Sequence, residues 1–229
     1  MTLNTIGKIT RDMYLGNGMI SVFYLLVMFA IQLVVVFVVP WLASEGEVSI
    51  YFGMSLGAST RIFMLILGFF AVRSYLTSYV ALGVTRRSFF WGCAFSTTLL
   101  AYSFALLVSI VGWVNLQISA SDMEMQVGSP GVTFLMNGMF YLLYYLVGWI
   151  IGLAFYNYRL WIGALSVLVG VMIVGLGEAL STEILSIGPI RSSLSLGLPT
   201  VVSVTSILIL LFVMLFVLKT LTREVAVKV

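Results

Sequence analysis

Six long apolar stretches, separated by short polar connections, decide what this chain can fold into. They cover residues 19–39, 54–71, 89–113, 132–155, 160–176 and 201–218. A helix needs roughly 20 mostly apolar residues to cross about 30 Å of hydrocarbon, and each stretch is near that length. Because 62% of the residues are hydrophobic and 8% are charged, lipid must be the solvent for most of the chain. We therefore predict an all-α, polytopic membrane protein, with six transmembrane helices in a single domain over residues 1–229.

The basic residues indicate how these helices are oriented, because cytoplasmic loops of membrane proteins are enriched in Lys and Arg. If both tails and the even-numbered connections share one side, most acidic residues fall on the other. The shared side then holds most of the basic residues: Lys8, Arg11, Arg73, Arg86, Arg87, Arg159, Lys219, Arg223 and Lys228. This asymmetry predicts two cytoplasmic termini, an even number of spans and a multi-pass protein of the plasma membrane.

The first 18 residues are too polar to form a span. Their apolar positions recur at helical spacing, with polar residues opposite: Leu3, Ile6, Ile9 and Met13. This pattern predicts an amphipathic helix over residues 1–18 that lies on the inner leaflet, with its basic face toward anionic lipid. Gly16, Asn17 and Gly18 then predict a flexible break before the first span. A mobile tail is the alternative that the sequence leaves open.

Residues 73–88, between the second and third spans, are less apolar than a span but too apolar for a solvated loop. One side of a helix over this segment would carry Tyr75, Leu76, Tyr79 and Leu82. Gly83 permits a sharp turn, and Thr85 is suited to cap the next helix. Arg86 and Arg87 would lie at the headgroup level. The segment predicts a short cytoplasmic helix with an aromatic and basic surface, or else a simple charged anchor for the third span.

Arg61 is the only ionisable residue well inside a span, where a charge costs at least about 2.5 kcal/mol. We expect it to snorkel to the outer headgroups. The alternative is that it faces a cavity or a partner helix, where it can meet an anionic group of a cargo. Glu178, at the end of the fifth span, is expected to be only interfacial. No carboxylate lies at mid-depth, so uphill transport would need a separate motor.

Other residues indicate how the spans pack. Pairs of glycines four residues apart, at Gly53 and Gly57 and at Gly148 and Gly152, predict close approach of helices. Gln32 and Asn137 are candidates for interhelical hydrogen bonds, with ordinary packing as the alternative.

The chain lacks the residues that most enzymes use. It has no histidine, a single cysteine (Cys93) and no phosphate-binding loop of the form G-x-x-x-x-G-K-[ST]. We therefore expect no enzymatic activity, and no catalytic, cofactor-binding or metal-binding residues. The net charge of +3 is too small and too scattered to suggest a nucleic-acid partner.

The layout resembles the permease subunits of bacterial ABC exporters of the ABC-2 type, particularly the small versions of Gram-positive bacteria. In sequence the resemblance depends mainly on ALGVTRRSFF, residues 81–90, which is similar to a signature that follows the second span of such permeases. The broken apolar connection before the sixth span, with its pieces 183–190 and 194–198, also fits this layout.

The resemblance implies a membrane-spanning subunit that forms a translocation path and couples to a separate cytoplasmic P-loop ATPase, which would bind ATP and Mg. A second permease chain, identical or paralogous, would complete the assembly in the bilayer, and the cargo would be a peptide, an antibiotic or a lipid-like molecule. Residues 73–88 would be the coupling helix, and Arg61, Gln32 and Asn137 candidates for the path. The ATPase-coupling residues would be Tyr75, Tyr79, Gly83, Thr85, Arg86 and Arg87. A non-transporting membrane partner, such as a sensor, immunity or assembly protein, is the alternative function.

Overall fold

The computed structural model describes residues 2–42, 52–71, 75–118, 130–158, 160–180 and 199–224, and the structural statements below concern these residues. This part of the chain contains seven helices and no strand, as the sequence predicts. They are α1 (Thr2–Leu42), α2 (Phe52–Ala71), α3 (Thr77–Ala81), α4 (Arg86–Ile118), α5 (Pro130–Asn157), α6 (Leu160–Ala179) and α7 (Thr200–Glu224).

Five of these helices are long and apolar enough to cross a membrane. The spanning windows are Thr5–Ile31 of α1, Arg86–Val111 of α4, Gly131–Asn157 of α5, Leu160–Ala179 of α6 and Thr200–Thr222 of α7. α2 carries a shorter apolar segment, Leu56–Ala71. The predicted class, an all-helical membrane protein, is confirmed.

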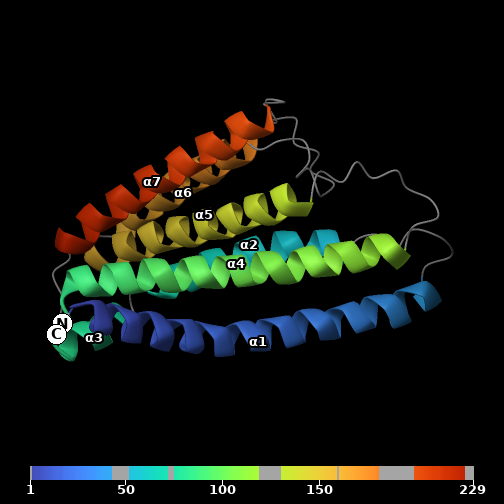
Figure 1. Ribbon diagram of the computed structural model, residues 1–229, viewed down its shortest axis with the longest axis horizontal. Helices are drawn as coiled ribbons and strands as arrows, with labels where there is room; N and C mark the ends of the chain where they lie inside the picture. The colour runs from blue at the N-terminus through green and yellow to red at the C-terminus, as the bar shows by residue number, and fades with distance from the viewer. Residues whose placement is uncertain are drawn as a thin grey trace.

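The six long helices run alternately in opposite directions along the longest axis of the molecule (Figure 1). The beginning of α1 and the end of α7 lie at the same end of the bundle, and the short α3 lies there too (Figure 1). We call this the α3 end.

α5 is the central helix. It packs against α2, α4, α6 and α7, whereas α1 packs chiefly on α4. In the spanning window of α5, 72% of the residues are buried by protein, against 11% in that of α1. The side chains that α5 buries include four large aromatic ones, Phe140, Tyr141, Tyr145 and Trp149. A helix that is apolar all round is suited to this central place.

The predicted break at Gly16, Asn17 and Gly18 is wrong. α1 runs without interruption from Thr2–Leu42 through these residues. Asn17 is 3% exposed, and Gly16 lies against the hydroxyl of Tyr75. Tertiary packing therefore outweighs the low helix propensity of the two glycines. Whether residues 1–18 lie on the membrane surface stays a prediction.

The close approach predicted for Gly148 and Gly152 is confirmed, and their partner is α2. A Cβ placed on Gly148 would overlap the carbonyl oxygen of Leu65, and one on Gly152 that of Phe69. Gly68 of α2 lies equally close to the carbonyl oxygen of Tyr145. The two backbones therefore touch directly along several turns. Gly57, by contrast, has only ordinary contacts.

Candidate functional site

Tyr75 fastens the segment before α3 to α1. Its hydroxyl donates a hydrogen bond of 2.9 Å to Oδ1 of Asn17, and a Cβ on Gly16 would lie 3.0 Å from the same hydroxyl. Burial raises the pKa of Tyr75 above its usual value near 10, so the phenol remains a donor at neutral pH. Gly16 and Asn17, which the sequence predicted to interrupt the helix, are thus the residues through which α1 contacts Tyr75.

The end of α3 and the start of α4 follow the chemistry that the sequence predicts. Gly83 has a φ of +78°, and the amides of Gly83 and Val84 donate to the carbonyls of Val80 and Tyr79. This is the Schellman arrangement, in which a left-handed glycine ends a helix. Thr85 caps α4, because its Oγ1 accepts a hydrogen bond of 3.3 Å from the amide of Ser88. The predicted turn and cap are confirmed.

α3 is shorter than the helix expected over residues 73–88. It consists of Thr77–Ala81, preceded by a helical turn at Tyr75 and Leu76. Tyr79 is half-buried, with its ring centroid 5.9 Å from that of Phe89. Burial, with a smaller effect of the Asp12 carboxylate, raises the pKa of Tyr79. The two tyrosines therefore hold the segment against the bundle.

The outward surface of this region is formed by other residues. Leu82 is 78% exposed, and Ala81, Thr85 and Arg87 are exposed beside it in sequence. We call these four residues the α3 surface.

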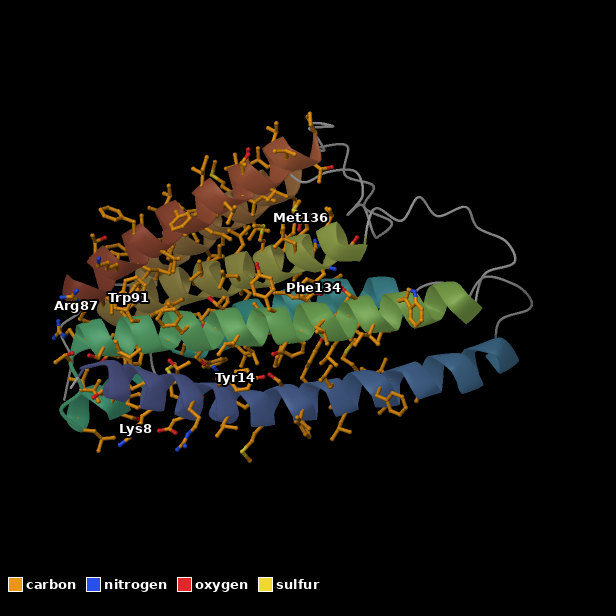
Figure 2. All side chains as sticks on the ribbon, in the orientation of Figure 1. Lys8, Tyr14, Arg87, Trp91, Phe134 and Met136 are labelled. Atoms are coloured by element: carbon orange, nitrogen blue, oxygen red, sulfur yellow. The ribbon has the colours of Figure 1, made fainter. Side chains whose placement is uncertain are left out.

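Basic side chains gather around the α3 surface. Figure 2 shows Lys8 and Arg87 at the α3 end of the bundle, where α1 and α4 begin. Arg86 and Arg87 occupy the first turn of α4, where a cation opposes the helix dipole. An anionic lipid surface or an acidic partner at this end would offset that repulsion.

Arg61 meets a partner helix, as the alternative interpretation has it, and whether it also reaches the headgroups stays a prediction. Its Nη1 lies 2.5 Å from Oε1 of Glu178 on α6, and the two side chains are only 16% and 28% exposed. Glu178 is therefore not simply interfacial, because it is the counter-ion of the buried arginine.

α5 completes this cluster. The guanidinium of Arg61 lies over the ring of Phe140, 4.8 Å from its centroid, and the hydroxyl of Tyr144 donates a bond of 3.2 Å to the same Glu178 oxygen. Phe140 and Tyr144 are four residues apart, so they share one face of α5. Three helices thus meet in a polar cluster within an apolar bundle.

Of the two remaining predicted path residues, the structure describes the side chain of one. Asn137 is 5% exposed on α5. The side chain of Gln32 lies outside the described part of the structure, as do Arg73 and the apolar pieces 183–190 and 194–198. The six predicted coupling residues, by contrast, all lie at the α3 end of the bundle.

Sequence reasoning missed a groove of about 530 Å³ between α1 and α4. Its walls are mostly apolar, and include Leu15, Met19, Leu25, Leu100 and Leu107. A hydrogen bond of 3.0 Å between the hydroxyls of Tyr14 and Ser103 lies at its side. No sequence pattern of a single helix predicts such a groove, because the groove depends on how two helices pack.

Comparisons of the chain with protein-family models, with curated proteins and with solved structures gave no match. What the protein does must therefore be inferred from its sequence and its geometry.

Proposed function

We propose that this protein is the membrane-spanning permease subunit of an ATP-driven ABC exporter, and that a separate ATPase subunit docks on the α3 surface. In this proposal α2 is the sixth crossing, both termini are cytoplasmic, and the α3 end faces the cytoplasm. The cargo would be a peptide, an antibiotic or a lipid-like molecule, and a second permease chain would complete the path.

One observation supports the proposal most strongly: a short, locally built helix presents an exposed surface between two membrane helices. α3 is ended by Gly83, followed by the Thr85 cap, and fastened to α1 by Tyr75. A plain connection needs none of these devices. Because Tyr75 links the segment to α1 and the Thr85 cap links it to α4, force on the α3 surface would reach two long helices.

The geometry also assigns different roles to the predicted coupling residues. Tyr75 and Tyr79 contact the bundle, so in this proposal they position the segment. Thr85 and Arg87 are exposed, so with Ala81 and Leu82 they are left to touch a partner.

The test is co-purification of the tagged full-length chain from its native membrane in mild detergent. We expect a P-loop ATPase to co-purify, and Leu82→Asp or Arg87→Glu to reduce its recovery about tenfold or more. Lys219→Glu is the control, because this exposed lysine lies near the end of α7, away from α3 in sequence. Absence of an ATPase from repeated wild-type preparations would favour the non-transporting alternative.

A further inference from the structure

Two buried polar atoms near the middle of the bundle have no hydrogen-bond partner among the described residues. They are Nε of Arg61 and the hydroxyl oxygen of Tyr141, and Tyr141 is 0% exposed. A buried donor without an acceptor is unfavourable, and more so when it belongs to a charged group. These two atoms therefore indicate a missing acceptor.

Both atoms border the same part of α2. Gly57 and Arg61 are four residues apart and share one helix face. The Tyr141 hydroxyl lies 4.0 Å from the position that a Cβ would take on Gly57. The preceding residue of α5, Phe140, lies under the guanidinium. Because Gly57 has no side chain, no Cβ lies between this face of α2 and the Tyr141 hydroxyl.

Glu178 uses only part of the guanidinium. The arginine has five N–H donors in a planar fork, which suits the paired oxygens of a carboxylate or a phosphate. Here the bond runs from Nη1 to one Glu178 oxygen, Oε1, which also accepts the Tyr144 hydroxyl. The Nε edge of the fork remains for a second acceptor.

Glu178 is placed so that an external oxyanion could replace its carboxylate on Arg61. It lies in the last turn of α6, and its side chain is 28% exposed. If an external oxyanion bound Arg61, the Glu178 carboxylate would turn to the polar end of the helix. The number of unpaired buried charges would not change, so the exchange avoids the large penalty of burying a lone ion.

The lipid-facing surfaces of α2 and α6 at this level are apolar. Ile62, the residue after Arg61, is 60% exposed, and Leu176, two residues before Glu178, is 52% exposed. In a bilayer such side chains contact acyl chains. A ligand that reaches Arg61 from this side would therefore carry its anionic group on an alkyl chain.

We propose that Arg61 and Tyr141 bind the oxyanion of an amphiphile, a carboxylate or phosphate on an alkyl chain, and that Glu178 is an internal competitor for Arg61. The oxyanion would accept hydrogen bonds from Nε of Arg61 and from the Tyr141 hydroxyl. The shared chemistry covers a lipid headgroup and a free amphiphile. This site does not depend on the proposed transport function, since binding would occur equally in a chain that transports nothing.

The test measures binding of dodecyl phosphate to the purified full-length protein in a neutral detergent. Glu178→Gln is expected to tighten binding about tenfold or more, because the competitor loses its charge. Arg61→Gln is expected to abolish binding, and Tyr141→Phe to weaken it severalfold. Arg11→Gln is the matched control, since it removes an arginine whose side chain is 75% exposed and which belongs to neither proposed site, and it should bind as the wild type does.

Further probes define the ligand class. Dodecanol and inorganic phosphate are each expected to bind at least about tenfold more weakly than dodecyl phosphate, because one lacks the charge and the other the chain. Competition with phosphatidylglycerol in nanodiscs distinguishes a lipid headgroup from a free amphiphile as the source of the oxyanion. If the lipid displaces dodecyl phosphate, the ligand is a lipid headgroup, and if it does not, a free amphiphile.

Two results would overturn the proposal. One is equal binding of dodecyl phosphate by wild type and Arg61→Gln, and the other is unchanged affinity in Glu178→Gln. If Arg61→Gln does not yield folded protein, the double variant Arg61→Gln with Glu178→Gln keeps a neutral, hydrogen-bonding pair. That double variant must also fail to bind dodecyl phosphate. If it binds, the proposed site is equally contradicted.

Discussion

The contact between α2 and α5 and the contact between α1 and α4 are built on opposite principles. α2 and α5 touch through their backbones, at Gly68, Gly148 and Gly152. α1 and α4 touch through side chains, such as the Tyr14 and Ser103 hydroxyls, and leave the groove of about 530 Å³ between them. The α2–α5 contact therefore leaves no room for the helices to shift, whereas the α1–α4 contact allows small shifts.

The difference matters because lipid supplies no hydrophobic force that brings helices together. Membrane helices associate through close packing and hydrogen bonds between helices. The first contact uses close packing, which is lost if the backbones separate by a fraction of an ångström. The second uses flexible side chains, which can form new pairs after a shift. We therefore expect α2 and α5 to move as one body in any conformational change, while α1 and α4 adjust.

Gly148→Ala should have the largest effect on this comparison. The new methyl group would meet the carbonyl of Leu65, which is backbone and cannot rotate away. We expect the free energy of unfolding to fall by about 1–3 kcal/mol or more, measured by titration of the detergent-solubilised protein with dodecyl sulfate.

Gly175→Ala is the matched control, because a Cβ there has no described atom within 4 Å. It should change the free energy of unfolding by less than about 0.5 kcal/mol. Equal losses for the two variants would show that Gly148 is sensitive for a reason other than backbone contact.

The sequence predicted some of the long helices well, because their length follows from the thickness of the bilayer, but α1 begins at Thr2 and not near residue 19. The expected span 132–155 corresponds to α5, Pro130–Asn157, within two residues at each end. The turn at Gly83 and the cap at Thr85 were equally predictable, since both depend on local backbone chemistry. Local rules failed at Gly16, where packing against Tyr75 keeps a helix that propensity disfavours.

The polar cluster was predictable only in part. A buried arginine requires a counter-ion, and that requirement follows from the cost of an unpaired charge in hydrocarbon. Its partner, Glu178, is 117 residues away in sequence, and Asn17 is 58 residues from Tyr75. Such pairs depend on how separate helices pack on α5 or α1, which no local pattern encodes.

Tyr75→Phe tests the polar contact between the α3 segment and α1. It removes the hydrogen bond to Asn17 and leaves a buried amide oxygen, since Asn17 is 3% exposed. We expect a loss of about 1–1.5 kcal/mol in the free energy of unfolding. Tyr158→Phe, at an exposed tyrosine after α5, is the control and should be neutral. If Tyr75→Phe lost more stability than Gly148→Ala, the α2–α5 contact would not be the most sensitive contact of the bundle.

Gly92→Ala tests a glycine on the adjustable side. A Cβ there would lie 2.6 Å from Cγ2 and 2.9 Å from Cβ of Ile9, so α1 must shift slightly, but these are side-chain atoms and not a backbone carbonyl. The loss in the same titration should be less than about 1 kcal/mol, below that of Gly148→Ala. Since both variants add one methyl group at a helix contact, the ratio of their losses measures how far each partner can yield. A loss as large as that of Gly148→Ala would mean that α1 and α4 are also fixed.

Tyr14→Phe should have the smallest effect. It removes the hydroxyl pair with Ser103, but Ser103 also donates a bond of 2.8 Å to the carbonyl of Leu99, so it keeps a partner. Hydrogen bonds between membrane helices contribute about 0.6 kcal/mol on average, and we expect a loss no larger than this. Ser103→Ala in the Tyr14→Phe background should then add less than about 0.5 kcal/mol. A loss above about 1.5 kcal/mol for Tyr14→Phe alone would show that this hydroxyl fixes α1 to α4, and the contrast with α2 and α5 would disappear.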